Sequence, residues 1–495
     1  MTARRFGRRD ERRATLLVLD GARPDVFRHL AAAGDLPHLS RYVLEPGAMP
    51  AAATVFPSTT GVAYLPFLTG CYPGTCNVPG IRWMEVARYG GRWIRDREHV
   101  RSYCGVQGGR LNHDLEPTVT TLFDLEPDTL ALCTPFTRGL SPRGEGMAFT
   151  RALLGAQAHY TSRYEPLDAA VGNALAQAAA LRRRLVFAVF PGVDGITHWF
   201  DPWHPRVLEA YRQFDRAFGR YVRAGGLSGH HLAVVVSDHG ASAIRRHADV
   251  SLALEQRGLP VLRHPLLWRR GPVIAVMVSG NAAAHVYLLP GRRRAHRYTL
   301  GEIEAGAVPG VPRDLVDFLI QLEGVALVAA TQGHDVIVRG RRGKARLRAA
   351  AGGTIEYLPE AGDVLGLGSY PRALSSAQWL GPSVDGPYPD APVQLLQLFR
   401  SPRTGDLVVA AAPGADLRDD WEIPEHRSGH GSLVADHMRC IVAANCPLPA
   451  AMRTVDVFPL IAAHLGYSTD PGIDGMLPAP AAAPAKAATV PGSSR

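Results

Sequence analysis

Short apolar runs alternate with helical patterns along much of the chain. Four runs predict buried strands, at residues 15–19 (TLLVL), 185–190 (LVFAVF), 232–236 (LAVVV) and 438–444 (MRCIVAA). Helical patterns lie at residues 24–33, 168–181 and 454–465. This alternation predicts an α/β fold, with a doubly wound, mostly parallel sheet flanked by helices.

The pattern changes between residues 251 and 425. Apolar runs at 273–278, 285–289 and 335–338 lie among Gly, Pro and Arg turns there. We interpret this part as a mixed α+β lobe inserted into a main domain that spans residues 14–468. The Ala- and Pro-rich segment 471–495 cannot bury a core and predicts a disordered tail.

Composition indicates an ordinary globular protein, with 46% hydrophobic and 20% charged residues among 495. No apolar run approaches the roughly 18 residues that a transmembrane helix needs. The first residues are basic, but the apolar stretch behind them, at 16–19, is too short for a signal peptide. We therefore expect a cytoplasmic protein without a membrane partner.

The net charge of +9 comes almost entirely from arginine, because the only lysines are Lys344 and Lys486. No long basic tract or RNA-binding signature accompanies this charge, so we expect no nucleic-acid partner. A basic surface would still attract an anionic substrate. The six cysteines contain no C-x-x-C pair, and free thiols are expected. Cys71 and Cys76 would be able to pair only in an exported protein.

Acidic residues follow three of the four predicted strands. Asp20 follows the first, Asp194 the second, and Asp238 with His239 the third. In an open α/β sheet the carboxyl ends of the strands line one crevice, where ligands bind. Several carboxylates crowded together there repel one another unless cations neutralise them. The sequence therefore predicts a metal site at this edge of the sheet.

Histidines extend this set of ligands. Asp194 and His198 are four residues apart, so on a helical turn both side chains face the same way. His430 lies in Ser-Gly-His-Gly at 428–431, between small residues that allow a ligand to approach. Nitrogen and carboxylate ligands together suit zinc, with manganese and iron as less favoured alternatives.

A nucleophile is expected within residues 54–70 (TVFPSTTGVAYLPFLTG), where Ser58, Thr59 and Thr60 lie at the expected start of a helix. A helix N-terminus binds anions through its free N–H groups, and metal coordination activates a hydroxyl there. An N-cap, a turn or a surface ion pair explains each of these features singly. Their joint occurrence at strand ends favours a functional site.

The chain resembles the alkaline phosphatase superfamily, and within it the bacterial type I phosphodiesterase/nucleotide pyrophosphatase branch, from about residue 15 to 467. The motifs that carry the resemblance are LLVLDGARPD (16–25), VFPSTTGVAYLPFLTG (55–70), VMVSGNAAAHVYL (276–288), DGITH (194–198), VVVSDHG (234–240) and HRSGHGSLVADHM (426–438). The resemblance implies two zinc ions and a threonine nucleophile, Thr60, that forms a phospho-threonine intermediate. It assigns the ligands of the two ions as Asp194, His198 and His430 for one, and Asp20, Asp238 and His239 for the other.

Two departures from the branch concern the binding of the phosphate group. Ala63 stands where the branch carries an Asn, and Cys76-Asn77 stands for its usual His-Gly. We expect the backbone N–H of Gly61, or the side chain of Asn77, to bind a phosphoryl oxygen instead. The expected substrate is a small anionic phosphate ester, with nucleotides among the candidates.

Other functions make different demands on these residues. A sulfatase needs Cys-x-Pro-x-Arg, whereas Cys71-Tyr-Pro-Gly-Thr75 lacks the Arg. A phosphomonoesterase or a phosphonate hydrolase would keep the same metal core and stays open. The alternative from another class is a catalytically silent, metal-stabilised binding protein, which the presence of Thr60 and all six ligands disfavours. The sequence does not determine the oligomeric state.

Overall fold

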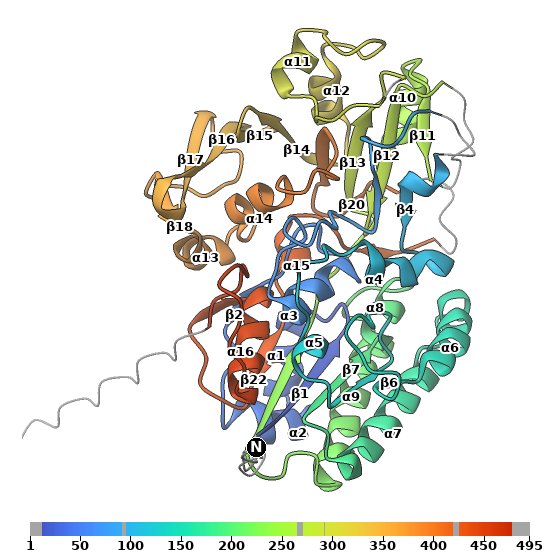
Figure 1. The fold of residues 1–495 in the computed structure, drawn as a ribbon, viewed down its shortest axis with the longest axis vertical. Helices are drawn as coiled ribbons and strands as arrows, with labels where there is room; N and C mark the ends of the chain where they lie inside the picture. Colours follow the sequence, from blue (N-terminus) through green and yellow to red (C-terminus); the bar gives the residue numbers. More distant parts are fainter. Residues whose placement is uncertain (1–11, 92–95, 265–270, 292, 419–424, 478–495) are drawn as a thin grey trace, which may run out of the picture.

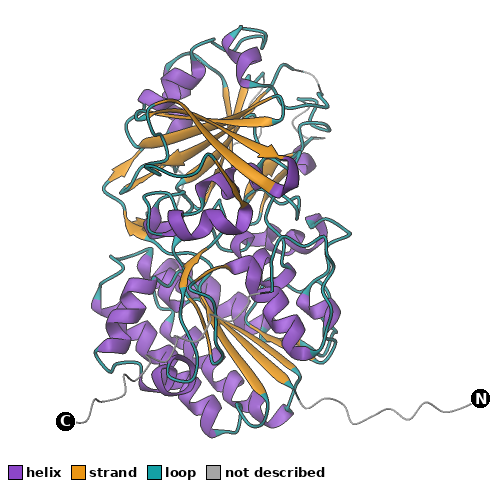
Figure 2. Cartoon of the chain, turned by 90° about the vertical axis from the view of Figure 1, so that its left-hand side faces the viewer, coloured by secondary structure: helices purple, strands orange, loops and turns teal. Residues whose placement is uncertain are grey.

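The computed structural model describes residues 12–91, 96–264, 271–291, 293–418 and 425–477. The basic residues 1–11, on which the expectation about a signal segment rests, lie outside the described residues, as does the part of the predicted tail from 478 onward. Figures 1 and 2 show two stacked lobes, a lower one with helices around its sheet and an upper one with a larger sheet. Among the described helices, none combines the length and apolarity needed to span a bilayer.

The lower lobe contains a six-stranded sheet. Its strands, in spatial order, are β22 (Val442–Ala444), β8 (His231–Val236), β1 (Arg13–Leu19), β7 (Leu185–Phe190), β5 (Thr129–Leu132) and β6 (Glu145–Gly146). β1 pairs in parallel with β7 and β8, and β5 in parallel with β7 and β6, whereas β22 is antiparallel to β8. The predicted doubly wound, mostly parallel sheet is confirmed.

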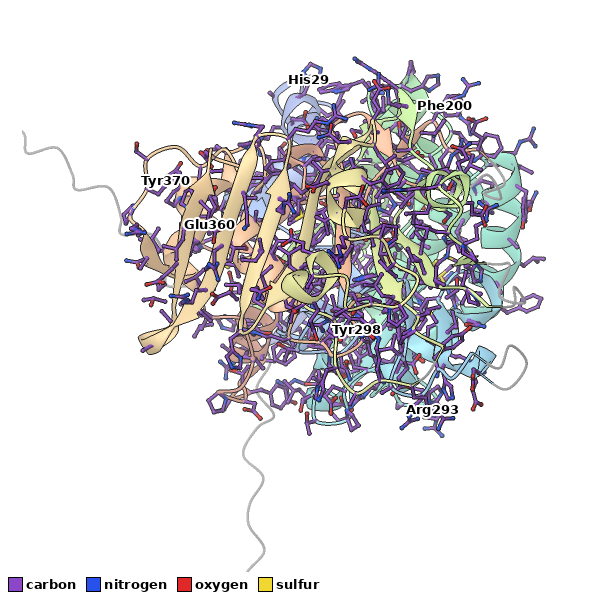
Figure 3. The ribbon with its side chains drawn as sticks, turned by 90° about the horizontal axis from the view of Figure 1, so that it is seen from above. His29, Phe200, Arg293, Tyr298, Glu360 and Tyr370 are labelled. Carbon is purple, nitrogen blue, oxygen red and sulfur yellow. The ribbon has the colours of Figure 1, made fainter. Side chains whose placement is uncertain are left out.

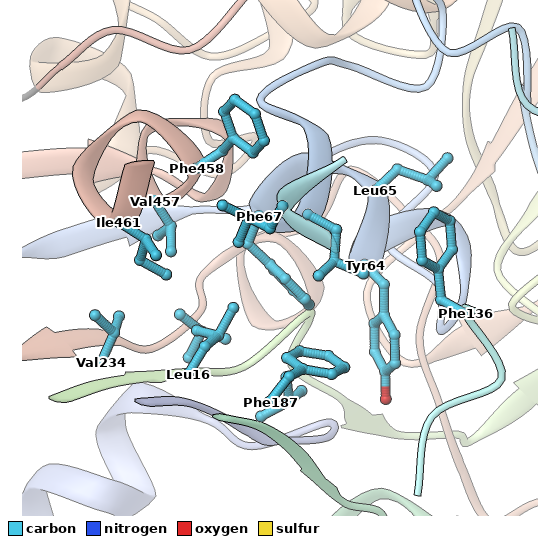
Figure 4. Close-up of a cluster of buried hydrophobic side chains, with 14 of the residues drawn as sticks. Leu16, Tyr64, Leu65, Phe67, Phe136, Phe187, Val234, Val457, Phe458 and Ile461 are labelled. Carbon is cyan, nitrogen blue, oxygen red and sulfur yellow. The ribbon is translucent and has the colours of Figure 1, made fainter. Parts of the chain in front are cut away.

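Helices cover both faces of this sheet, which explains why its strands read as continuous apolar runs. Leu16 and Val18 of β1 join a core on one face, shown in Figure 4, and Leu17 and Leu19 join a second core on the other. The helices of the first core include α3 (Leu65–Thr69) and α16 (Val457–Leu465). Those of the second include α1 (Pro24–Ala32), α7 (Glu165–Leu181) and α9 (Pro205–Arg223).

The predicted strand at 438–444 is only partly correct. Its first residue ends a short helix, α15 (Ala435–Met438), and the strand β22 begins at Val442. The intervening backbone bonds a different neighbour, since the carbonyl of Met438 accepts from Thr54 and the N–H of Cys440 donates to Ala52. The single apolar run therefore hydrogen-bonds to two different segments, residues 52–54 and strand β8, and the periodicity of the sequence does not reveal this division.

The upper lobe contains a nine-stranded sheet that is antiparallel apart from the pair β11–β12. In spatial order the strands are β11 (Val261–Arg263), β12 (Ile274–Ser279), β13 (Ala283–Leu288), β19 (Leu407–Ala411), β14 (Val325–Gln332), β15 (Asp335–Gly340), β16 (Gly343–Ala350), β17 (Thr354–Ala361) and β18 (Ala373–Ser375). The three runs predicted there correspond to β12, β13 and β15. Figure 3 views this lobe from above, with Glu360 of β17 towards one edge.

Short helices accompany this sheet. They are α10 (Val250–Gln256), α11 (Leu300–Glu304), α12 (Leu315–Gln321), α13 (Ser376–Val384) and α14 (Ala391–Leu398). Because helices and an antiparallel sheet share this part of the chain, the structure agrees with a mixed α+β lobe. Its predicted limits of 251 and 425 stay a prediction.

The start of the segment predicted as a tail is packed on the protein. Oδ2 of Asp474 accepts the N–H of Tyr72 at 2.8 Å, and the N–H of Met476 donates to Asp456 Oδ1 at 2.9 Å. Residues 471–477 therefore contact the lower lobe. All six cysteines are free, including the neighbouring Cys71 and Cys76.

His285 on β13 ties the upper sheet to the loop that follows α3. Its Nε2 donates to the carbonyl of Pro79 at 2.9 Å, and its Nδ1 accepts the N–H of Gly405 at 3.3 Å. A second proton on this ring would break the bond from Gly405. Burial, reinforced by the charge of Arg297, lowers the pKa of His285 from 6.5 to about 4.

We expect this histidine to make unfolding sensitive to acid. Between pH 6.5 and 4 the unfolded chain binds a proton here that the folded chain does not, so stability falls as the pH decreases. Across this interval the free energy of unfolding decreases by about 3 kcal/mol. In urea unfolding, His285→Gln should therefore weaken the pH dependence in this window, whereas His230→Gln, at an exposed position, should not. Equal pH dependence in the wild type and both variants would contradict this expectation.

Candidate metal centre and nucleophile

The parallel pairing of β1 and β8 brings their carboxyl ends together. Val18 lies opposite Val236, so Asp20 and Asp238 follow neighbouring strands at the same edge. Gly21 turns the chain there with φ of +67° and donates its N–H to Asp238 Oδ1 at 3.1 Å. A Cβ on Gly21 would lie 2.6 Å from the Cβ of Asp194, so only glycine allows this approach.

Asp194 and His198 lie on α8 (Gly192–Thr197) and its C-cap, directly after β7. The predicted i, i+4 contact is present, with His198 Nε2 3.2 Å from Asp194 Oδ2. His430 follows the short strand β21 (Ser428–Gly429), and its Nε2 lies 3.8 Å from Asp194 Oδ1. Asp194 is thus placed between two imidazoles.

The three histidines of the site share one arrangement. In each, Nδ1 lies beside a backbone carbonyl: that of Ser428 for His198 (3.0 Å), Gly240 for His239 (3.1 Å) and Ser58 for His430 (3.0 Å). A carbonyl only accepts, so each Nδ1 carries the proton and each Nε2 keeps a lone pair. The same arrangement orients histidines that bind metals in proteins.

The three carboxylates titrate differently because their neighbours differ. Burial, together with the charge of Asp194, raises the pKa of Asp238 to about 7. Burial and the charges of Asp238 and Asp194 raise the pKa of Asp20 well above its usual range. Burial also opposes ionisation of Asp194, but the positive charge that His198 and His430 carry when their rings are protonated outweighs it and lowers the pKa of Asp194. Without a cation, the cluster therefore holds less than three negative charges at neutral pH.

The donor atoms of the cluster fit metal ions. Two sets of side chains bring them within 4.8 Å of one another: Asp194 with His198 and His430, and Asp20 with Asp194 and His239. Asp238 borders the second set, with its Oδ2 3.2 Å from His239 Nε2. Asp194 Oδ1 and Asp238 Oδ2 are buried without a hydrogen-bond partner. A cation would satisfy both atoms, which hydrogen bonding within the protein does not.

Among the neighbouring hydroxyl residues Ser58, Thr59 and Thr60, Thr60 is the one with hydrogen bonds to these ligands. Its Oγ1 lies 2.9 Å from His239 Nε2 and 3.3 Å from Asp20 Oδ1. Ser58 donates instead to the carbonyl of Ser432, and Thr59 is buried. The helix begins slightly later than expected, because Gly61, with φ of +86°, caps a short 3-10 turn (Val62–Tyr64) that leads into α3.

The two groups expected to bind phosphoryl oxygens differ in their surroundings. Within the described part of the chain, the N–H groups of Gly61 and Val62 donate to no protein acceptor. Asn77 is engaged elsewhere, since its Oδ1 accepts from Ser401 Oγ at 2.8 Å and its carbonyl from Arg403. None of the hydrogen bonds of Asn77 among the described residues reaches Thr60 or a predicted ligand. The geometry thus favours Gly61 over Asn77.

Sequence reasoning missed three side chains at this site. The hydroxyl of the buried Tyr64 donates to Asp20 Oδ2 at 2.5 Å. The ring of His426 stacks on that of His198 at 4.0 Å, and Asn281 Nδ2 lies 3.0 Å from His426 Nδ1. Spacing could have indicated two of them, because Tyr64 follows Thr60 by four residues and His426 precedes His430 by four, whereas Asn281 has no such spacing.

We expect Tyr64→Phe to lower turnover roughly tenfold without unfolding the protein. A buried hydrogen bond to a charged group contributes about 1.5–3 kcal/mol, and its loss lets the Asp20 carboxylate rotate. Steady-state kinetics with a chromogenic phosphate diester would measure the effect. Tyr89→Phe, in a distant core cluster, provides a matched control that should keep full activity. Full activity in Tyr64→Phe as well would show that this hydrogen bond does not orient Asp20.

The fold and the site together define an α/β protein that gathers metal-binding side chains beside a hydroxyl group. The chain belongs to the type I phosphodiesterase / nucleotide pyrophosphatase family, whose sequence model matches residues 14–305. It is therefore a phosphoester hydrolase of a metal-dependent family within the alkaline phosphatase superfamily. A comparison with curated proteins finds no match.

Solved structures with the same fold include two hydrolase types. The chain is similar to phosphonoacetate hydrolase from Sinorhizobium meliloti 1021 in complex with phosphonoformate, with a TM-score of 0.56 and 16% identity over 92% of this chain and 97% of that one. It is also similar to human ectonucleotide pyrophosphatase / phosphodiesterase 5 (TM-score 0.52, 13% identity, 94% and 97% covered). An inactive murine form of the latter, in complex with AMP, matches with a TM-score of 0.52 and 12% identity over 93% and 96% of the chains.

Proposed function

We propose that the protein hydrolyses phosphodiesters or nucleotide pyrophosphate bonds, with Thr60 as the nucleophile at a site for two zinc ions. The observation that carries this proposal is the position of Thr60 Oγ1, in contact with both His239 Nε2 and Asp20 Oδ1. A hydroxyl that touches two potential metal ligands is suited to attack a phosphorus atom held at the same place.

In this proposal Thr60 Oγ1 forms a bond to phosphorus while the bond to the leaving ester oxygen breaks. Water then breaks the bond between phosphorus and Oγ1 and regenerates the hydroxyl. The hydroxyl proton would pass to Asp20 Oδ1, 3.3 Å away, because an ion held by His239 would occupy the single lone pair of its Nε2. This transfer leaves the lone pairs of Oγ1 free for phosphorus. The unpartnered N–H groups of Gly61 and Val62 would hold phosphoryl oxygens.

The ligand set supports two ions. Asp194, His198 and His430 would hold one. Asp20, Asp238 and His239 would hold the other. Ions held by these residues would supply Lewis-acid stabilisation of negative charge on the reacting oxygens. Mixed imidazole and carboxylate ligation favours zinc over manganese and iron.

The structural neighbours suggest which substrate classes to consider. A murine neighbour is in complex with AMP, which supports a nucleotide-type substrate here. Another neighbour is a phosphonoacetate hydrolase, which makes phosphonate hydrolysis the second candidate function. Both reactions use the same core, so the residues above serve either one.

Metal analysis and a substrate panel test this function together. Elemental analysis of the purified protein should find close to two zinc ions per chain. The zinc-loaded protein should hydrolyse bis-p-nitrophenyl phosphate faster than p-nitrophenyl phosphate or phosphonoacetate, and a chelator should abolish the activity. Activity on phosphonoacetate alone would favour the second candidate. Full activity without any metal would contradict the proposed site.

A further inference from the structure

The helix α6 (Ala148–Thr161) presents its apolar face to solvent. Ala158 is its only buried residue. Side chains three or four positions apart share one side of a helix, and one side of α6 carries only apolar or aromatic residues. These residues, all exposed, form the α6 stripe: Phe149, Ala152, Leu153, Ala156 and Tyr160.

The exposure of the α6 stripe is unusual for a surface helix. Phe149 is 80% exposed, Leu153 59% and Tyr160 66%, which places them among the most exposed of the large apolar side chains in the described chain. A surface helix normally turns such residues to the core and its polar residues to water. Contiguous apolar patches of this kind are typical of surfaces that bind another protein or a membrane. Figure 1 shows α6 at the outer edge of the lower lobe.

The C-terminal end of α6 adjoins the metal-ligand cluster. His159, beside Tyr160 in the sequence, has its ring centroid 6.4 Å from that of His426. The ring of His426 in turn stacks on the predicted ligand His198 at 4.0 Å. Whatever covers the α6 stripe therefore lies at the rim of the site.

The charges around α6 indicate what covers it. Arg143 and Arg163 flank the helix at its two ends and are exposed, and within the described residues neither forms an ion pair. Among the nearby exposed carboxylates, Glu165 is paired with Arg206 and Glu425 with Arg418, and Glu145 forms no ion pair with a described residue. A second copy of the chain would bring a further set of these arginines to the interface. An anionic surface would neutralise them.

We propose that the α6 stripe and its flanking arginines dock the protein on an anionic lipid surface. Phe149, Leu153 and Tyr160 enter the boundary between headgroups and acyl chains, and Arg143 and Arg163 contact lipid phosphates. Docking in this orientation places the rim of the site at the membrane surface, so the substrate class is a phosphodiester carried by an amphiphile. The proposed docking depends only on the exposed residues of α6 and its flanking arginines, whereas the substrate class rests on the function proposed above.

Vesicle binding tests the docking without reference to catalysis. Full-length protein should co-sediment with phosphatidylcholine vesicles that contain phosphatidylglycerol, less with phosphatidylcholine alone, and less at high salt. The double variant Phe149→Glu/Leu153→Glu should lose at least about tenfold in binding. Leu252→Glu, at an exposed apolar position of α10 in the upper lobe, is the matched control and should bind like the wild type.

Hydrolysis of a soluble substrate separates this inference from the proposed function. The double variant should keep wild-type turnover of bis-p-nitrophenyl phosphate, which also shows that it is folded. Failure of the wild type to bind any vesicle, or equal binding by the double variant, would overturn the docking while leaving the function standing. A wild-type dimer that the double variant disrupts would assign the stripe to a second copy and would also overturn it. Vesicle binding without any hydrolysis would refute only the proposed function.

Discussion

Thr60→Ala is expected to reduce phosphodiester turnover by on the order of 10³-fold or more, with little change in zinc content. Thr60 Oγ1 is the atom proposed to bond to phosphorus, and alanine offers no substitute for it. The side chain is partly exposed, and the backbone turn at Gly61 does not depend on its hydroxyl. The fold should therefore survive the change. Steady-state kinetics and elemental analysis of the same preparation would measure both quantities.

Neighbouring hydroxyls provide the control for Thr60. Thr59→Ala removes a buried hydroxyl one residue away and should lower turnover a few-fold at most. Ser58→Ala breaks the bond to the carbonyl of Ser432 and should act on stability more than on chemistry. If Thr60→Ala and Thr59→Ala caused equal, mild losses, water would have to attack the phosphorus directly, and the phospho-threonine step would be abandoned.

Asp194→Asn is expected to abolish activity by weakening both metal positions at once. Asp194 belongs to both sets of side chains whose donor atoms converge, and its Oδ1 is buried without a partner. Loss of a residue that merely orients a ligand costs 10- to 100-fold in metal affinity, so loss of this carboxylate should cost at least about 100-fold. The amide keeps the shape of the side chain but removes its charge.

Zinc titration followed by thermal unfolding would measure this effect. Zinc should raise the Tm of the wild-type protein, because a ligand that binds only the folded state stabilises it. The increase should be strongly reduced in Asp194→Asn. Asp25→Asn, which removes an exposed carboxylate paired with Arg23, is the control and should keep the zinc response. A normal zinc response in Asp194→Asn would exclude this residue as a ligand.

Much of the lower sheet was predictable because a strand that is buried on both faces appears in the sequence as a continuous apolar run. β1, β7 and β8 are continuous apolar runs, and the residues that follow them reach one edge whenever the strands are parallel. The pairing of Asp194 with His198 was predictable for a similar reason, since an i, i+4 contact needs only one helical turn. Both inferences depend on periodicities that are written in the sequence itself.

The tertiary structure decided the features that depend on contacts with no regular spacing in the sequence. Thr59 and Thr60 carry the same hydroxyl group, but in the folded chain it is the oxygen of Thr60, beside the turn at Gly61, that lies 2.9 Å from His239 Nε2. The tautomer of His430 depends on the carbonyl of Ser58, and Asn77 is drawn to Ser401, each more than 300 residues away. Local sequence determined which elements form and which chemical groups lie at their ends. Because polar side chains select partners by distance and direction in space, only the assembled fold determined which of those groups meet.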